Sequence, residues 1–328
     1  MKAALLGGSD VMLHRVYSEK NFAALEALFE GEIPVCTDSH DGRLKDAEIL
    51  FSTWGMPEYT EAEIAEYLPR AKALFYGAGS VQKFARPFLN RGVRLFSAWR
   101  ANGLAVAQYT YAQILLALKG YFPVQRRMSE SRAAAAELGR NYPGAYDVKV
   151  GLLGCGAIGS LVAEQLKQAD AEVLVFDPFL PDARAEALHV RKTTMEEIFE
   201  SCDVVSNHLA NLPTTVGIIR RAHLLSMKPY STFINTGRGA QLDEKDLYDM
   251  LTRDETRTAL LDVLTDERHT DENPLAKLTN CFITPHIAGA LGLEVRRMGR
   301  YMIEAFEQYR DGQPTDCEVS LKMLETMA

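Results

Sequence analysis

Residues 152–160 read LLGCGAIGS. Two leucines run into Gly154, Gly156 and Gly159, which form a G-x-G-x-x-G pattern at the start of a helical segment. Glycine is needed in such a turn because a side chain would block the backbone from approaching a pyrophosphate at the helix N-terminus. The pattern alone predicts either a dinucleotide-binding turn or an ordinary tight turn, so its surroundings have to decide.

The surroundings favour a dinucleotide. The turn follows the apolar run VKVGLL at 148–153, and a second run, EVLVF at 172–176, ends just before Asp177. Asp177 comes eighteen residues after Gly159, close to the about 20 residues at which a carboxylate binds ribose hydroxyls. A carboxylate there would repel the additional phosphate of NADP, so NAD is the predicted cofactor. The predicted phosphate-side residues are Gly154, Gly156, Ala157, Ile158 and Gly159.

From residue 148 onward, short apolar runs alternate with helical segments. The further runs are DVVSN at 203–207, STFIN at 231–235, TALLD at 258–262 and CFIT at 281–284. Such runs, separated by helices, are typical of a parallel sheet covered on both faces. The first hundred residues repeat the theme more weakly, with KAALL, AEILF, KALFY and VRLF. The predicted fold class is α/β, with two Rossmann-like doubly wound parallel-sheet domains.

Two long helices are predicted where these regions meet. The segment GLAVAQYTYAQILLALKG would carry the chain from one lobe to the other, and a helix with apolar residues from Val295 to Tyr309 would carry it back. We therefore expect a discontinuous, flavodoxin-like substrate domain, residues 1–100 and 288–328, and an NAD-binding Rossmann domain, residues 101–287. Two domains also suit a chain of 328 residues, and two lobes predict a cleft.

Composition argues against several classes of partner. The net charge is −8 with both signs mixed along the chain, which offers no basic stripe for nucleic acid. No run reaches the roughly 18 apolar residues of a membrane helix, and the apolar run before Asp10 is too short for a signal-peptide core. The five cysteines form no C-x-x-C pair. We expect a cytoplasmic protein without nucleic-acid, membrane or metal partners.

Three residues suited to chemistry follow predicted strands. Arg238 follows STFINTG, Glu267 follows TALLDVLTD and His286 follows CFITP. Because open α/β sheets bind ligands at the carboxyl ends of their strands, we expect these side chains to lie together. A guanidinium suits a carboxylate, an imidazole exchanges protons near neutral pH, and a carboxylate orients the ring. Taken singly, each could instead be a surface ion pair, a solvated loop acid or a structural histidine.

Four motifs in this order carry a family resemblance: GLLGCGAIG, FINTGRGAQLDEKDL, ALLDVLTDE and FITPHIAGA. The chain resembles the D-isomer-specific 2-hydroxyacid dehydrogenase family, which contains phosphoglycerate, glycerate and D-lactate dehydrogenases, over roughly residues 74 to 300. The resemblance implies that Arg238 holds the substrate carboxylate and polarises the carbonyl. It implies that Glu267 is the carboxylate partner and that His286 is the general acid/base.

The resemblance also implies cofactor contacts and an assembly. Asp262 would receive the nicotinamide amide, Thr236 and Gly237 would pass beneath that ring, and His208 would lie near the cofactor. A homodimer built on the cofactor domain is the implied assembly. The H-x-P-x-T cofactor loop of the family reads HLANL here, and its VAEH reads VAQY.

The first domain departs further from the family pattern. The G-x-G-x-D-N-[IV]-D segment is replaced by GAGSVQKF, although backbone amides around Ala78 and Gly79 could still bind a carboxylate. Trp54 and Arg100 each follow a predicted strand. They would suit a larger or doubly acidic 2-oxo acid, or they could serve only in packing between the lobes.

The sequence thus predicts an NAD-dependent oxidoreductase that interconverts a small 2-oxo acid and its D-2-hydroxy acid. Two alternatives stay open. One is an NAD(H)-sensing interaction protein of the same fold, because function belongs to sites rather than folds. The other is a formate dehydrogenase-like enzyme, although that branch resembles a His–Gln pairing and Glu267 argues against it.

Overall fold

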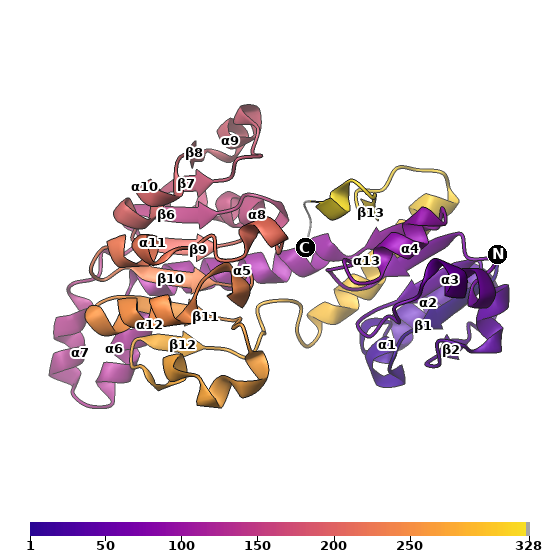
Figure 1. Cartoon of the computed structure of the whole chain (residues 1–328), viewed down its shortest axis with the longest axis horizontal. Helices are drawn as coiled ribbons and strands as arrows, with labels where there is room; N and C mark the ends of the chain where they lie inside the picture. The colour runs from indigo at the N-terminus through magenta and orange to yellow at the C-terminus, as the bar shows by residue number, and fades with distance from the viewer. Residues whose placement is uncertain (326–328) are drawn as a thin grey trace. The chain divides into compact units, whose positions relative to one another are not determined.

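The computed structural model describes residues 1–325, and the chain divides into two compact units (Figure 1). The first unit comprises Met1–Ala105 and the segment from Ala290 onward, and the second comprises Val106–Gly289. Each unit is built on one sheet, of six strands in the first and seven in the second. The predicted α/β class with two doubly wound sheets is confirmed.

The sheet of the first unit has the strand order β13-β5-β4-β3-β1-β2. Without β13, this is the flavodoxin-like order 2-1-3-4-5, and those five strands are parallel. β13 pairs antiparallel with β5, which the sequence did not predict. The strands are β1 (Ala3–Leu6), β2 (Val35–Cys36), β3 (Ile49–Ser52), β4 (Ala73–Tyr76), β5 (Arg94–Ser97) and β13 (Glu318–Val319).

Neighbouring residues of a strand point to opposite faces of the sheet, and both faces of this sheet are buried. Leu6, Leu50 and Leu74 enter one core, whereas Phe51 and Phe75 enter the other. The helix near the C-terminus, α13, covers the second core with Met298, Met302 and Phe306. The helices of this unit are α1 (Asp10–Val16), α2 (Glu19–Phe29), α3 (Glu61–Tyr67), α4 (Ala85–Asn90) and α13 (Glu294–Arg310).

The sheet of the second unit has the order β12-β11-β10-β9-β6-β7-β8 and is parallel throughout. Read from β8, this is the Rossmann order 3-2-1-4-5-6 with one more strand, so its switch point lies between β6 and β9. The strands are β6 (Tyr146–Leu153), β7 (Asp170–Phe176), β8 (Arg191–Lys192), β9 (Val204–Asn207), β10 (Thr232–Asn235), β11 (Thr258–Leu261) and β12 (Cys281–Ile283).

Helices cover both faces of the second sheet. They are α6 (Tyr121–Met128), α7 (Arg132–Gly139), α8 (Ala157–Leu166), α9 (Asp182–Leu188), α10 (Met195–Ser201), α11 (Arg221–Ser226) and α12 (Glu244–Arg253). The long predicted helix is α5 (Trp99–Leu118). No helix within residues 1–325 has the length and apolarity needed to cross a bilayer. α8 ends before Ala169, and its buried face is formed by Gly159, Val162, Ala163 and Leu166.

The register of the second sheet aligns the last residues of its strands. Asn207 pairs with Leu153 and Asn235, and Leu261 pairs with Asn235 and Ile283. Leu153 also pairs with Phe176. The residues that follow this row therefore leave the sheet side by side at its carboxyl edge. They are Gly154, Asp177, His208, Thr236, Asp262 and Thr284.

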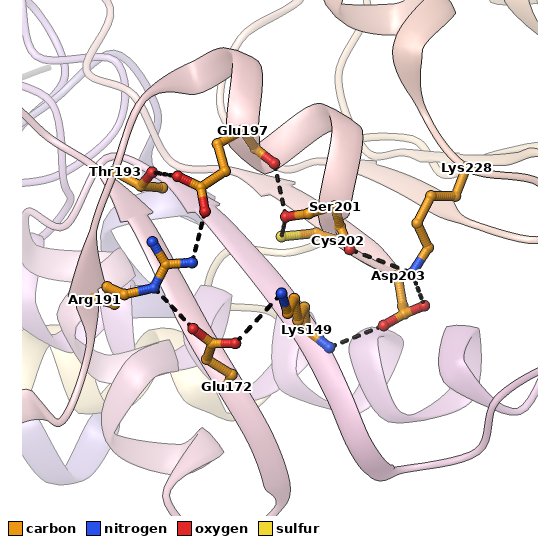
Figure 2. Close-up of polar contacts among 9 residues, drawn as sticks. All are labelled: Lys149, Glu172, Arg191, Thr193, Glu197, Ser201, Cys202, Asp203 and Lys228. Atoms are coloured by element: carbon orange, nitrogen blue, oxygen red, sulfur yellow. Dashed lines mark hydrogen bonds and ion pairs between the residues drawn. The ribbon is translucent and has the colours of Figure 1, made fainter.

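The opposite, amino edge of this sheet carries a network of charges (Figure 2). Asp203, just before β9, accepts from the amide of Lys149 at 2.9 Å and from Nζ of Lys228 at 2.5 Å. Arg191 bonds Glu172 and Glu197 at 2.8 and 2.7 Å, and these hydrogen bonds lower the pKa of both carboxyls. The network joins the starts of β6, β7, β8 and β9.

Asp203 should matter more for stability than the exposed ion pairs of this unit. Its side chain is 16% exposed, whereas that of Asp182, paired with Lys192, is 94% exposed. Asp203→Ala leaves the Lys149 amide without an acceptor and should lower the free energy of unfolding by about 1–3 kcal/mol. The control Asp182→Ala should leave it nearly unchanged. Urea titrations of both variants test this, and equal losses would contradict it.

Candidate active site

His286 and Glu267 form the most direct contact among the predicted site residues. Nδ1 of His286 lies 3.0 and 2.9 Å from the two carboxylate oxygens of Glu267. Glu267 begins a 3₁₀ turn (Glu267–Glu272) after β11, and His286 lies in the loop after β12. The two side chains are 43% and 47% exposed, so solvent or a small molecule can reach them. With Nδ1 held by a carboxylate, Nε2 is the nitrogen that can exchange a proton with a ligand.

Arg238 lies in the loop after β10, within electrostatic range of Glu267. Burial lowers the pKa of its guanidinium, and the Glu267 carboxylate opposes this shift. Within residues 1–325 the side chain makes one hydrogen bond, from Nη1 to the carbonyl of Gly237 at 2.7 Å. Its other N–H donors are therefore available to an anion, and a planar guanidinium suits a carboxylate. The structure thus brings Arg238, Glu267 and His286 into one group on the second unit.

The loop that carries His286 is held by a buried carboxylate. Asp262 is 3% exposed, and it accepts hydrogen bonds from the amides of Ile287 and Ala288 at 2.9 and 2.8 Å. It also accepts from Oγ1 of Thr284 at 2.6 Å, and its carbonyl accepts from the amide of His286 at 3.1 Å. His286 itself has φ of 54°, in the left-handed region that non-glycine residues rarely adopt. Asp262 therefore stabilises an unfavourable backbone at His286.

Two hydroxyl groups of helix α5 extend this arrangement. The hydroxyl of Tyr109 lies 2.9 Å from Oγ1 of Thr284, and that of Thr110 lies 3.3 Å from Oγ1 of Thr236. Because Thr284 donates to Asp262, the Tyr109 hydroxyl donates to Thr284. Thr236 is 8% exposed, and Gly237 beside it is buried. The side chains that follow β10 and β12 are thus fixed from the helix as well as from the sheet.

The glycine turn leaves room for a phosphate at the start of α8. A Cβ on Gly156 would have no atom within 4 Å, whereas one on Gly159 would lie 2.1 Å from the carbonyl oxygen of Gly154. Gly154 has φ of 88°, which favours glycine, and packs against the backbone at His208. Ala157 and Ile158 open the helix, so their amides face this space. The residues fit the expected dinucleotide.

The carboxylate of Asp177 faces this turn. It accepts from the amide of Cys155 at 2.7 Å and from the amide of Phe179 at 2.9 Å. Each carboxylate oxygen has a second lone pair, so ribose hydroxyls could still bind. The ring of Phe179 is highly exposed, and Pro178 and Phe179 bring no cation to this end of β7.

His208 lies across the switch point, just after β9. Its Nε2 is 2.9 Å from Oγ of Ser206, and its Nδ1 is buried with no partner within residues 1–325. The residue as a whole is half-buried, but its ring is enclosed, and burial lowers its pKa to about 4. A neutral imidazole with one unpaired nitrogen beside the glycine turn is a second feature that fits a bound dinucleotide.

Four of the five predicted substrate-side residues, all except Arg238, belong to the first unit. Ala78 is buried and Gly79 is half-buried, and the hydroxyl of Ser97 lies within hydrogen-bond distance of both their carbonyls, at 2.9 and 2.6 Å. Within residues 1–325 the amides of Ala78 and Gly79 have no acceptor. Arg100 pairs with Asp316 at 3.3 Å and lies over the Trp99 ring at 4.7 Å, and Trp54 is 36% exposed.

Sequence reasoning missed three buried amide side chains and the Tyr109–Thr284 contact. Asn207, Asn235 and Gln241 are at most 1% exposed, and Asn207 donates to both of the other two. The sequence does contain one sign of this cluster, because an asparagine ends each of the apolar runs DVVSN and STFIN. A polar residue that ends a buried strand needs a partner, and here the partners are each other.

The two glycines of the turn should respond differently to alanine. Gly156→Ala places a methyl group in open space at the helix N-terminus, so it should keep the thermal unfolding temperature but raise the Kd for NADH about tenfold or more. Gly159→Ala meets a backbone carbonyl and should lower both stability and NADH affinity. Fluorescence titration and thermal unfolding test this, and unchanged NADH affinity in Gly156→Ala would contradict it.

The depressed pKa of His208 predicts a pH dependence of stability. Below about pH 6.5 the unfolded imidazole takes up a proton, whereas the native one stays neutral until about pH 4. Stability should therefore fall as the pH decreases from about 6.5 to about 4, by up to about 3 kcal/mol from this group. His208→Gln should reduce that fall in urea titrations across this pH range. An identical pH profile in the variant would show that the ring is not enclosed in solution.

Comparisons with known proteins find dehydrogenases and reductases among the curated relatives of this chain. Among curated relatives, the D-3-phosphoglycerate dehydrogenase of Archaeoglobus fulgidus is 28% identical over 72% of this chain and 44% of its own length. The matched part thus spans less than half of that relative. The glyoxylate reductase of Korarchaeum cryptofilum is 26% identical over 92% of this chain and 93% of its own length.

A solved structure and a protein family also match this chain. The solved D-isomer specific 2-hydroxyacid dehydrogenase of Lactobacillus delbrueckii ssp. bulgaricus, in its NAD-complexed form, aligns with a TM-score of 0.79 at 22% identity. That likeness covers 98% of this chain and 100% of the other, and it concerns the fold. Residues 111–288, more than half of the chain, match the family described as D-isomer specific 2-hydroxyacid dehydrogenase, NAD binding domain. This chain therefore belongs to the D-isomer specific 2-hydroxyacid dehydrogenase family.

Proposed function

We propose that this chain is an NAD-dependent dehydrogenase that interconverts a small 2-oxo acid and its D-2-hydroxy acid. The observation that carries the proposal is the contact of Nδ1 of His286 with both Glu267 oxygens, beside a guanidinium with unused donors. Such a group offers an anion site and a proton donor at one place, which reduction of a 2-oxo acid requires.

Each side chain has a distinct role in this proposal. Arg238 binds the carboxylate of the acid and polarises the neighbouring carbonyl. Nε2 of His286 gives a proton to the carbonyl oxygen during reduction and takes it back during oxidation. Glu267 orients the imidazole and stabilises its protonated form. When bound, the nicotinamide cofactor supplies or accepts the hydride.

The residues near the cofactor and the acid support further assignments. The carboxylate of Asp177 at the end of β7 favours NAD over NADP, since it would repel a 2′-phosphate. The amides of Ala78 and Gly79, which have no acceptor in the described part of the chain, would supply donors for a carboxylate in the first unit. Trp54 and Arg100 are further candidates for contacts that select the acid.

Turnover of a panel of acids tests the proposal. The 328-residue protein with NADH should reduce at least one of glyoxylate, pyruvate, 2-oxoisocaproate, oxaloacetate and 3-phosphohydroxypyruvate, and NADPH should support much slower reduction. His286→Ala should lower kcat at least about 100-fold, and Arg238→Lys should lower kcat/KM about 10- to 100-fold because a lysine cannot bind a carboxylate in two-pronged fashion. Nicotinamide absorbance is the measurement.

Three results would contradict the proposal. They are no reduction of any acid by the parent protein, full activity of His286→Ala, and oxidation of formate with NAD in preference to the hydroxy acids. Calorimetric binding of NAD without any turnover would instead indicate a protein that senses the cofactor.

A further inference from the structure

Three buried amide side chains connect two loops at the carboxyl edge of the second sheet. This cluster, Asn207, Asn235 and Gln241, is fully enclosed, with exposures of 0%, 1% and 0%. Nδ2 of Asn207 donates to Oδ1 of Asn235 at 3.0 Å and to Oε1 of Gln241 at 2.6 Å. Buried amides stabilise a structure only when their donors and acceptors are satisfied, so the partners of each amide reveal what the cluster holds.

Gln241 uses the whole hydrogen-bonding capacity of its amide group. Its Oε1 accepts from Asn207 and from the backbone amide of Arg238 at 3.2 Å. Its Nε2 donates to the carbonyls of Leu209 and Ala210 at 2.9 and 3.0 Å. One side chain therefore contacts the loop that carries Arg238 and the loop that follows His208.

The rest of the cluster fixes the same two loops. Asn235 accepts from the amide of Gly237 at 3.0 Å and donates to the carbonyl of Arg238 at 3.2 Å. Oδ1 of Asn207 accepts from the amide of Leu209 at 3.2 Å. Gly237 packs against the cluster, since a Cβ there would lie 2.8 Å from Oε1 of Gln241. The backbone at 237–238 and at 209–210 is thus ordered by one set of hydrogen bonds.

We infer that Gln241 is a positioning residue that links the cofactor-side loop at 208–210 to the arginine loop at 236–238. The inference rests on the proposed function, in which Arg238 holds the acid. Gln241 reaches no ligand itself and acts through the backbone of Arg238 and of Leu209. An apolar side chain at this position leaves two carbonyls, an amide N–H and the Asn207 amide group short of partners, so both loops lose their fixed conformation.

Hydrogen exchange and NADH binding test this role in the full-length protein. Gln241→Met keeps the approximate shape but removes all four hydrogen bonds. We expect at least tenfold faster amide exchange in peptides covering 208–212 and 236–241, with β6 and β7 unchanged. The Kd for NADH and the KM for the best acid of the panel should each rise about tenfold, with a smaller change in kcat.

Gln113→Met is the matched control. Gln113 lies on α5 in the same unit, half-buried, and its amide oxygen is buried without a partner within residues 1–325. Its replacement should leave exchange in both loops and the NADH Kd unchanged. A similar rise in Kd in both variants would overturn the inference, because it would indicate general loss of stability.

Gln241→Glu provides a test that does not depend on tolerance of methionine. A protonated glutamic acid at this position can accept from the Arg238 backbone amide and donate to the carbonyl of Leu209 or Ala210. An ionised carboxylate has no proton to donate and repels both of these carbonyl oxygens. NADH affinity of this variant, relative to the parent at the same pH, should therefore be about tenfold better at about pH 6 than at about pH 8. A ratio that does not change with pH would overturn the inference.

The two proposals fail separately. Absence of turnover in the parent protein would remove the proposed function, whereas exchange and NADH titration would still measure the coupling of the loops. Unchanged exchange at 208–212 and 236–241 in Gln241→Met would remove the positioning role and leave the dehydrogenase proposal in place.

Discussion

Parallel hydrogen bonding in the second sheet is the constraint on which the site depends. The register places Leu153, Phe176, Asn207, Asn235, Leu261 and Ile283 in one row, so the chain leaves the sheet next to each of them at a common edge. Residues separated by more than a hundred positions in the sequence thereby become neighbours. A shift of one residue in any of these pairings would turn the following side chain to the other face.

The two edges of this sheet are used in opposite ways. At the amino edge the described charges are paired, as in the contacts of Asp203 with Lys149 and Lys228. At the carboxyl edge, among the residues that the structure describes, Arg238 keeps unused donors and Nδ1 of His208 lacks a partner, and His286 has a left-handed backbone. Unsatisfied groups and backbone strain reduce stability, and they concentrate where a ligand can satisfy them.

Much of this arrangement could be predicted from the sequence, because strands and helices of this fold have clear hydrophobic patterns. The glycine turn, Asp177 and the order of the strand ends needed only spacing and the rule for parallel sheets. The two-residue strands β2, β8 and β13 were not predicted, because such short segments show no hydrophobic periodicity. The antiparallel pairing of β13 with β5 joins segments more than 200 residues apart, which no local pattern reveals.

Side-chain contacts to the backbone could not be predicted in the same way. The sequence predicted a nicotinamide contact for Asp262, which stays a prediction. It did not predict that the Asp262 oxygens accept from Thr284, Ile287 and Ala288, because two of these donors are backbone amides that no residue letter reveals. Gln241 stands in a quoted motif, but its four partners become visible only when two loops are seen together. The side chain of Arg100 pairs with Asp316 in the first unit, a contact that the sequence did not suggest.

Helix α5 restricts insertions and deletions in this part of the chain, because it makes two sets of contacts on one helix. Tyr109 and Thr110 reach Thr284 and Thr236, while Ile114, Ala117 and Leu118 on the same helix are buried in the core of the second unit. Insertion of one residue between Thr110 and Ile114 would rotate the hydroxyls by about 100° relative to that apolar anchor. Substitutions on the exposed side of α5 are compatible with the site, but a change in the number of residues is not. Between Thr110 and Ile114, the number of residues is therefore more strongly constrained than their identity.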